Sequence, residues 1–286
     1  MAPILAEPPT RALNNPYTPE LRRPGMPLFD QISATLTGVA DDRPPVVLVH
    51  GLTYDRRQWG PLTRELDALD PGRRTFALDL PGHGQSPPRD AYGSDETAEV
   101  LHRAITAAGL DAPVVVGHSL GGILATVYAA RYPTRGVLNL DQPLRLGRFG
   151  AVVRDVEPVL RGPDWRAVWD RFVAGMGTDG LAPDARALAR DASAPRADLL
   201  LGYWAEILGS TDEEIDARRA RELAEIAARG VPYVLVTSTE PEVRLPGVEQ
   251  VVLPGGGHFP HLAHPRAVAE LLAQSVQRVG PPGAGW

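Results

Sequence analysis

Short apolar runs separated by longer amphipathic segments dominate the pattern of this chain. The runs are rich in valine and leucine and lie at residues 46–49, 75–80, 114–116, 137–140, 231–236 and 248–253. Helices are predicted between them, at residues 60–69, 95–108, 120–131 and 265–279. Continuous apolar strands spaced by helices are typical of an α/β protein, with a mostly parallel central β-sheet flanked by helices on both faces.

Three stretches depart from this alternation. Residues 1–28 carry seven prolines and no periodicity, which predicts an extended arm. Residues 31–37 alternate between apolar and polar positions, as a half-buried antiparallel strand does. The strand rhythm then breaks over residues 142–230, where helix-like segments hold several aromatic residues. We therefore expect a core formed by residues 29–141 and 231–286, and a helical cap inserted at residues 142–230.

Composition and charge exclude several classes of protein. The chain has 286 residues, enough for one α/β domain with an insertion, and its 43% hydrophobic content excludes wholesale disorder. A net charge of −6 argues against a basic face for nucleic acid. The absence of cysteine removes disulfides, thiolate catalysis and cysteine-bound metals. Because no apolar run reaches the roughly 18 residues of a membrane span and no secretory signal is evident, we expect a cytoplasmic protein.

The most informative motif is G-x-S-x-G at residues 117–121, which follows an apolar strand and precedes a helix-forming run. This is the context of a nucleophile elbow, a sharp turn that presents a serine hydroxyl above the sheet. Gly117 and Gly121 permit the tight turn and the close backbone approach. The helix N-terminus beside Ser119 favours a developing anion. Ser119 is therefore the candidate nucleophile.

Another strand end offers donors for an oxyanion. Residues 47–49 form a strand that is followed by His50, Gly51 and Leu52. The backbone amides of Leu52 and of Leu120, which directly follows the nucleophile, are the expected oxyanion donors. The alternative for His50 and Gly51 is a plain turn that ends the strand.

A late histidine is the expected general base. The strand at residues 248–253 leads into three glycines and His258, so this loop can bring the imidazole over the carboxyl edge of the sheet. His261 and His264 follow at three-residue spacing, which raises a metal site as an alternative. His264 precedes Pro265 at a predicted helix start and is better explained by that position. We expect no metal and no cofactor.

Taken together, these segments resemble the α/β-hydrolase fold superfamily, in a capped form with a serine nucleophile. The resemblance rests on His50-Gly51, on residues 78–86 (LDLPGHGQS), on residues 117–122 and on residues 257–259, whose order and spacing match over nearly the whole chain. It implies a Ser-His-acid triad. It also implies that residues 78–86 form a loop with a structural role.

The acid of this triad has more than one candidate. Members of the superfamily commonly place it after the seventh strand, where this sequence has Glu240 and Glu242 around Pro241. The spacing from Glu240 to His258 is too short for the helix usually found between them. A second location known in the superfamily, the end of the sixth strand, holds Asp141. We prefer Asp141 and keep Glu240 and Glu242 as alternatives.

These residues predict an enzyme that cleaves a small acyl substrate, a carboxylic ester or a lactone, through an acyl-enzyme. Thioesterase, C–C bond hydrolase and cofactor-free perhydrolase activities are alternatives on the same triad, as is a non-catalytic member of the fold that binds a ligand. A serine at position 119 argues against the related enzymes that form an alkyl ester on an aspartate. The candidate pocket residues are His50, Gly51, Trp165, Trp169 and Trp204. Either Arg145 or Arg148 is a candidate contact for a substrate carboxylate.

Overall fold

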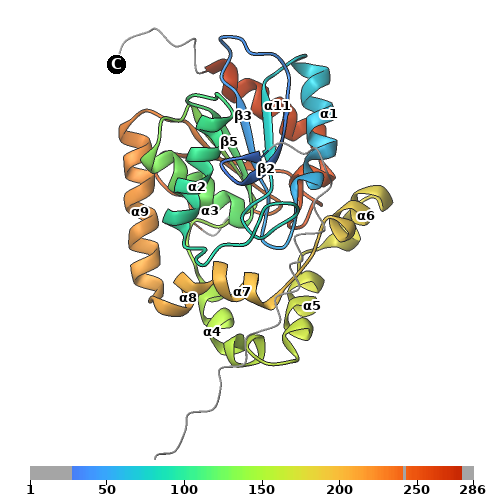
Figure 1. Ribbon diagram of the computed structural model, residues 1–286, viewed down its shortest axis with the longest axis vertical. Coiled ribbons are helices and arrows are strands. Elements are labelled where there is room, and N and C mark those ends of the chain that lie inside the picture. Colours follow the sequence, from blue (N-terminus) through green and yellow to red (C-terminus); the bar gives the residue numbers. More distant parts are fainter. Residues whose placement is uncertain (1–27, 241–242, 279–286) are drawn as a thin grey trace, which may run out of the picture.

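The computed structural model describes residues 28–240 and 243–278, so almost all of the expected arm and Glu242 lie outside the described residues. The described residues form one eight-stranded sheet (Figure 1). Its strands are β1 (Leu28–Phe29), β2 (Ile32–Thr37), β3 (Val46–Val49), β4 (Thr75–Leu78), β5 (Val114–His118), β6 (Gly136–Leu140), β7 (Tyr233–Thr237) and β8 (Val248–Val252). Their order is β1-β2-β4-β3-β5-β6-β7-β8. Strands β1 and β2 are antiparallel to their neighbours and the others are parallel, which confirms the predicted mostly parallel sheet.

The central strands are continuous apolar runs because both of their faces are covered. All four residues of β3 are fully buried. Val46 and Leu48 belong to the hydrophobic core on one face, whereas Val47 and Val49 belong to the core on the other. This two-sided burial is the reason that these strands show no alternation in the sequence.

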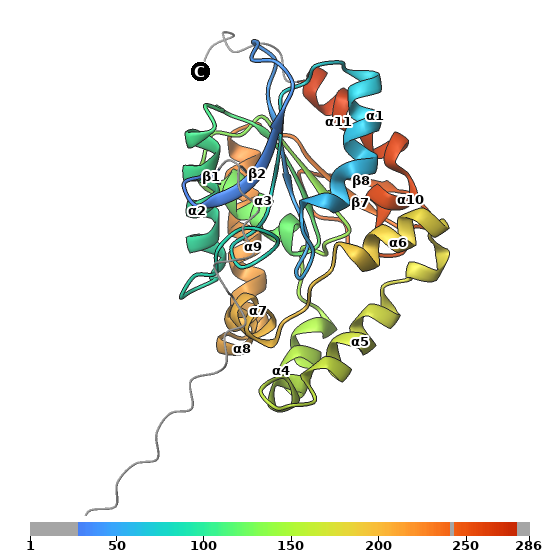
Figure 2. The same ribbon diagram turned by 45° about the vertical axis from the view of Figure 1, so that its right-hand side comes forward.

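Helices cover both faces of the sheet (Figures 1 and 2). One face carries α1 (Gly60–Leu69) and α11 (Pro265–Arg278), with η2 (Arg56–Trp59) and α10 (Pro260–Ala263) beside them. The other carries α2 (Ser94–Ala107), α3 (Leu120–Arg131) and α9 (Asp212–Ala228). The helices predicted in the core therefore form within a residue or so of their expected bounds. No helix in the described part of the chain is both long and apolar enough to cross a membrane.

Between β6 and β7 the chain leaves the sheet and forms a group of helices, which we call the insertion. It consists of α4 (Arg148–Leu160), α5 (Trp165–Gly175), η3 (Thr178–Gly180), α6 (Pro183–Asp191), α7 (Ala197–Tyr203) and α8 (Ala205–Gly209). Both views place these helices beyond one end of the sheet (Figures 1 and 2). Helix α9, which lies within the expected cap of residues 142–230, packs instead against α3 on the sheet, so the insertion helices end earlier, at Gly209. A capping box between Thr211 and Glu214 begins α9 and separates it from the insertion.

Candidate active site

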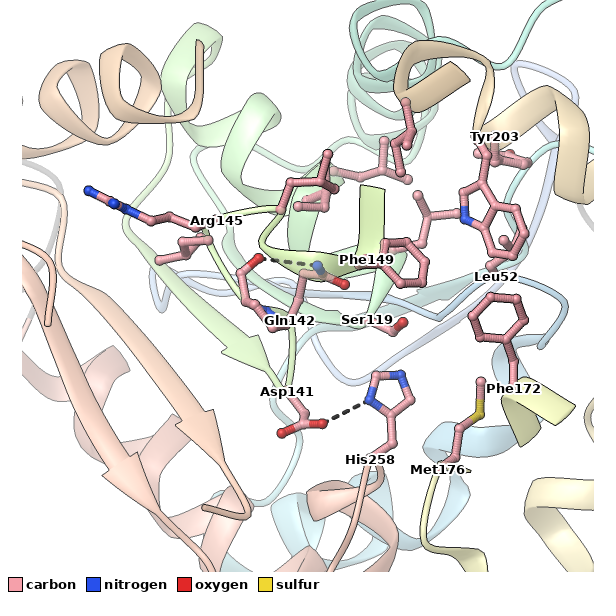
Figure 3. Close-up of a pocket in the computed structure, with 18 of the residues that line it drawn as sticks. Leu52, Ser119, Asp141, Gln142, Arg145, Phe149, Phe172, Met176, Tyr203 and His258 are labelled. Carbon is pink, nitrogen blue, oxygen red and sulfur yellow. Dashed lines mark hydrogen bonds and ion pairs between the residues drawn. The ribbon is translucent and has the colours of Figure 1, made fainter. Parts of the chain in front are cut away.

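A cavity of about 620 Å³ lies between the carboxyl ends of the parallel strands and the insertion (Figure 3). All five residues of the predicted triad and oxyanion hole line it: Leu52, Ser119, Leu120, Asp141 and His258. They come from four segments that are far apart in the chain and follow β3, β5, β6 and β8. The fold therefore brings the predicted nucleophile, base, preferred acid and oxyanion donors to one place.

Ser119 lies at a strained turn between β5 and α3. Its φ of 51° and ψ of −123° fall outside the regions that L-residues favour, and such a conformation costs about 1–3 kcal/mol. The turn is tight because two glycines remove side chains from it. A Cβ at Gly117 would lie 2.0 Å from the Gly121 carbonyl oxygen, and one at Gly121 would lie 2.1 Å from the Val49 carbonyl oxygen. Helix α3 can therefore begin directly beside the end of the sheet.

A hydrogen bond joins His258 to Asp141. The His258 Nδ1 atom lies 2.8 Å from Asp141 Oδ2, and each side chain is about one-fifth exposed. Because a carboxylate only accepts, Nδ1 carries a proton in this contact, which leaves Nε2 of a neutral ring able to accept one. The Ser119 hydroxyl lies on the other side of the ring from Asp141 (Figure 3).

The backbone fixes Asp141 at the edge of the sheet. Its N–H donates to the Val236 carbonyl at 2.8 Å, so the chain stays attached to β7 just beyond the end of β6. Its φ of 57° turns the chain sharply out of the strand. Asp and Asn tolerate this conformation better than most residues.

The alternative acid Glu240 lies elsewhere. Its side chain is 73% exposed and its Oε2 lies 3.4 Å from Arg244 Nη2. Glu240 is not among the residues that line the cavity. The structure brings Asp141, and not Glu240, to the imidazole of His258.

Two distant segments hold the peptide backbone of His258. The His118 Nε2–H donates to the His258 carbonyl at 2.7 Å, and the His258 N–H donates to the Met176 carbonyl at 2.9 Å. Gly257 has a φ of 53°, and a Cβ there would lie 2.5 Å from the Met176 oxygen. Neither His118 nor Met176 was predicted from the sequence to have a role at the site. One feature of the sequence could have pointed to a role for His118: it is a polar residue at the end of a buried strand, inside the G-x-S-x-G motif.

The two expected oxyanion donors have free backbone amides. Leu120 is the first residue of α3, where an N–H has no acceptor within the helix. In the loop after β3, Thr53 donates its N–H to His83 Nε2 at 3.0 Å and Tyr54 donates to the Gly51 carbonyl at 3.2 Å. Within residues 28–240 and 243–278, the Leu52 and Leu120 amides have no acceptor.

His50 and Gly51 do not line the cavity, which corrects their assignment as pocket residues. His50 is fully buried beneath the loop, where its Nδ1–H donates to the Gly51 carbonyl at 2.8 Å. Its Nε2 accepts the Leu80 N–H at 2.9 Å. The imidazole points into the protein because both of its nitrogens are used to join the loop of Leu52 to the loop after β4.

The loop at residues 78–86 contacts η2, which follows the loop of Leu52, through the buried carboxylate of Asp79. Asp79 is 1% exposed and accepts the backbone N–H groups of Arg56 and Gln85, each at 2.9 Å. The Ser86 hydroxyl donates to the Asp79 carbonyl at 2.7 Å. These bonds tie the loop to η2 and agree with a structural role.

Aromatic side chains of the insertion form one wall of the cavity. Trp169 and Trp204 line it as expected. Trp165 does not, because its ring packs half-buried against the hydrophobic core. Phe149 and Phe172, which the pocket prediction omitted, also line the cavity, and their rings and that of Trp204 pack edge to face with centroids 5.5–5.9 Å apart. Among the candidate arginines, Arg145 lines the cavity and Arg148 does not.

A buried polar network fixes the chain just after Asp141. The Asn139 side chain donates to the Gln142 carbonyl at 2.9 Å and accepts the Gln142 N–H at 3.1 Å. It also donates to the Tyr233 hydroxyl at 3.0 Å. Asn139 is a polar residue within the otherwise apolar run at residues 137–140, and this exception in the sequence could have indicated its structural role.

Several buried histidines remain uncharged. Burial lowers the pKa of His50, His83 and His118, and lowers the pKa of His261 to about 3. His261 has no hydrogen-bond partner among the described residues, and its ring packs 4.8 Å from that of Trp59. His264 Nε2 instead contacts the Pro254 carbonyl at 2.8 Å. His261 and His264 thus have separate environments.

The chain is similar to known proteins over most of its length. Residues 46–271 match the model of a family described as the alpha/beta hydrolase family. A pimeloyl-[acyl-carrier protein] methyl ester esterase of Xanthomonas campestris is 31% identical over 257 residues, which cover 82% of this chain and 95% of the relative.

Two solved structures share the fold. An AqdC variant, described as cleaving the ring of the Pseudomonas quinolone signal, has a TM-score of 0.73 and 21% identity over 86% of this chain and 96% of that one. A thermophilic esterase of Thermogutta terrifontis has a TM-score of 0.68 and 21% identity over 87% of this chain and 93% of that one. At these identities the likeness concerns the fold alone.

The buried histidines predict a specific pH dependence of stability. Their pKa values in the folded protein lie below the value of about 6.5 in an unfolded chain. The unfolded chain therefore binds more protons below that pH, and the free energy of unfolding falls as the pH is lowered. His261→Leu removes one of these groups without breaking a hydrogen bond. We expect it to reduce the slope by up to about 1.4 kcal/mol per pH unit between pH 6 and 4.

Urea unfolding of both proteins at a series of pH values measures this difference. Carboxylates also titrate in this range, but they are common to both proteins and cancel in the comparison. Identical slopes for the wild type and His261→Leu would contradict the assignment of His261 as a buried neutral group.

Proposed function

Because the chain belongs to the alpha/beta hydrolase family and is an enzyme with hydrolase activity, we propose that it is a serine hydrolase that cleaves a carboxylic ester or a lactone. The observation that carries this proposal is the 2.8 Å contact from His258 Nδ1 to Asp141 in the cavity that Ser119 lines. This contact leaves the other ring nitrogen as a base beside a hydroxyl. A base oriented by a carboxylate is what activation of a serine requires.

In the first half of the reaction, Ser119 Oγ attacks the carbonyl carbon of the substrate while its proton passes to His258 Nε2. Asp141 accepts the Nδ1–H bond throughout and stabilises the imidazolium that forms. The tetrahedral intermediate then expels the alcohol, which takes the proton from Nε2. The product of this half is an ester between the acyl group and Ser119.

The oxyanion of the tetrahedral intermediate is proposed to accept hydrogen bonds from the Leu52 and Leu120 amides. Both amides border the cavity, and α3 directs the positive end of its dipole toward Ser119. Such preorganised donors contribute about 3–4 kcal/mol each to the stabilisation of the transition state. In the second half, His258 Nε2 takes a proton from a water molecule as the water oxygen attacks the acyl carbon. That proton then passes to Ser119 Oγ as the ester bond breaks, which releases the acid and restores the hydroxyl.

The insertion is proposed to act as a cap that selects the acyl substrate. Its aromatic side chains and those of the core leave about 620 Å³ beside Ser119, which suits a small molecule with an apolar body. A relative named as a methyl ester esterase makes a simple carboxylic ester the first substrate to test.

An activated Ser119 should react with a fluorophosphonate. We expect intact-protein mass spectrometry to show one adduct per chain for the wild type and none for Ser119→Ala, because the phosphorus is attacked by the same oxygen that attacks an acyl carbon. An adduct that persists in Ser119→Ala would place the reactive group elsewhere. A wild type without an adduct would favour a ligand-binding member of the fold, and retention of a bound ligand during gel filtration would then be measured.

A substrate panel separates the remaining alternatives. Under the proposal, an aryl ester or a lactone is turned over faster than an acyl thioester or a β-diketone, and Ser119→Ala abolishes the turnover. Faster thioester cleavage would indicate a thioesterase, and cleavage of the diketone alone would indicate a C–C bond hydrolase. Peracid formation from a carboxylic acid and hydrogen peroxide tests the perhydrolase alternative.

The acid can be tested by two isosteric substitutions. Asp141→Asn keeps the shape of the side chain and suits the positive φ, but it can no longer accept the Nδ1–H with a full charge. We expect kcat to fall roughly 10⁴-fold. Glu240→Gln, at an exposed position outside the cavity, should leave kcat unchanged. The opposite pattern in the esterase assay would identify Glu240 as the acid.

A further inference from the structure

The side chain of His118 contacts the proposed base from behind the cavity. Its Nε2 lies 2.7 Å from the carbonyl oxygen of His258, and the two rings lie 4.9 Å apart. His118 does not line the cavity and therefore does not meet the substrate. It precedes Ser119 in the chain, so one short segment carries the nucleophile and also binds the loop of the base.

The partners of His118 require one tautomer of its ring. A carbonyl oxygen only accepts hydrogen bonds, so the Nε2 atom that faces His258 carries the proton. His118 is completely buried, and burial together with His261 and His258 lowers its pKa well below the usual value. The ring is therefore neutral and its Nδ1 is an acceptor. Gln58 Nε2, 3.3 Å away, is the donor that this tautomer needs.

Packing leaves the His118 ring little freedom to move. The rings of His261 and Phe259 lie 4.5 Å and 5.3 Å from it, and that of Tyr54 lies 6.2 Å away. Gln58, His118, Phe259 and His261 are all fully buried. The hydrogen bond to His258 thus comes from a rigid part of the protein.

We propose that His118 is a positioning residue that sets the location of the His258 imidazole through the His258 backbone, and that Gln58 selects the tautomer that allows this. The inference rests on the proposed function, because it assumes that His258 serves Ser119 as the base. It assigns to the first variable position of the G-x-S-x-G motif a role in aligning the two reacting groups.

The loop of His258 depends on this contact because its own backbone supplies little support beyond a turn bond from the Phe259 N–H to the Gly256 carbonyl at 3.0 Å. Three consecutive glycines precede His258, and two of them, Gly255 and Gly257, have positive φ values of 90° and 53°. Such a segment has many accessible backbone conformations. The Met176 carbonyl holds the N–H side of the residue and His118 holds its carbonyl side. Loss of one contact lets the imidazole shift, and a shift of about 1 Å can reduce a rate by about 10²-fold.

The test compares two substitutions at His118 that differ in hydrogen bonding. His118→Phe keeps a flat ring but removes the donor, whereas His118→Gln keeps a donor at the distance of Nε2. We expect His118→Phe to lower kcat about tenfold or more with little change in KM, since the substrate does not touch this residue. The rate of fluorophosphonate labelling should fall in parallel, and His118→Gln should recover most of both rates.

Two further variants distinguish positioning from packing. Gln58→Leu leaves His118 in place but removes the donor to Nδ1, and we expect kcat to fall about fivefold. His261→Leu alters the packing against the same ring without touching either hydrogen bond, and we expect a changed melting temperature with unchanged kcat. Melting temperatures of all variants show which of them are folded under the assay conditions. If His118→Phe does not fold, the kcat of Gln58→Leu tests the positioning role of His118.

The outcomes separate this inference from the proposed function. A wild type that is neither labelled by the fluorophosphonate nor active on esters overturns the proposed function, and the inference with it. An active wild type whose folded His118→Phe and Gln58→Leu variants keep the wild-type kcat overturns the inference alone. Equal losses of kcat in His118→Phe and His118→Gln would also overturn it, because the retained donor would then have no effect.

Discussion

The approach of α3 to the end of the sheet, with no side chain between them, is the constraint on which the rest of the site depends. A Cβ at Gly117 or Gly121 would lie about 2 Å from a backbone oxygen, so the turn that carries Ser119 can form only with glycine at both positions. This turn fixes the hydroxyl, the Leu120 amide and the start of the α3 dipole together. The strain at Ser119 is tolerated because buried strands and a buried helix hold both of its ends.

The remaining groups reach Ser119 because parallel strands end at the same edge of the sheet. Asp141 follows β6 and His258 follows β8, and neither would meet the other in an extended chain. Their 2.8 Å contact also depends on the insertion, since the Met176 carbonyl just after α5 binds the backbone of His258. The insertion therefore helps to position His258 and also forms a wall of the cavity.

Neutral imidazoles connect several of the loops around the site by hydrogen bonds. His50, His83 and His118 each use one nitrogen as a donor and the other as an acceptor, and thereby connect loops that carry no regular backbone ladder. A charged lysine only donates and an ionised carboxylate only accepts, so neither could replace these rings. The cost is sensitivity to acid, because each ring must stay unprotonated to keep its acceptor.

The sheet, the core helices and the candidate roles of Ser119 and His258 could be predicted from the sequence, because apolar runs and the glycine-serine turn are patterns of neighbouring residues. It left Asp141 and Glu240 as rival acids, and it mistook His50, Gly51 and Trp165 for pocket residues. Which carboxylate meets His258, which side chains face the cavity and how the backbone of His258 is held are contacts between distant segments. These contacts follow from the folded arrangement alone, because strand register and the packing of the insertion cannot be read from spacing along the chain.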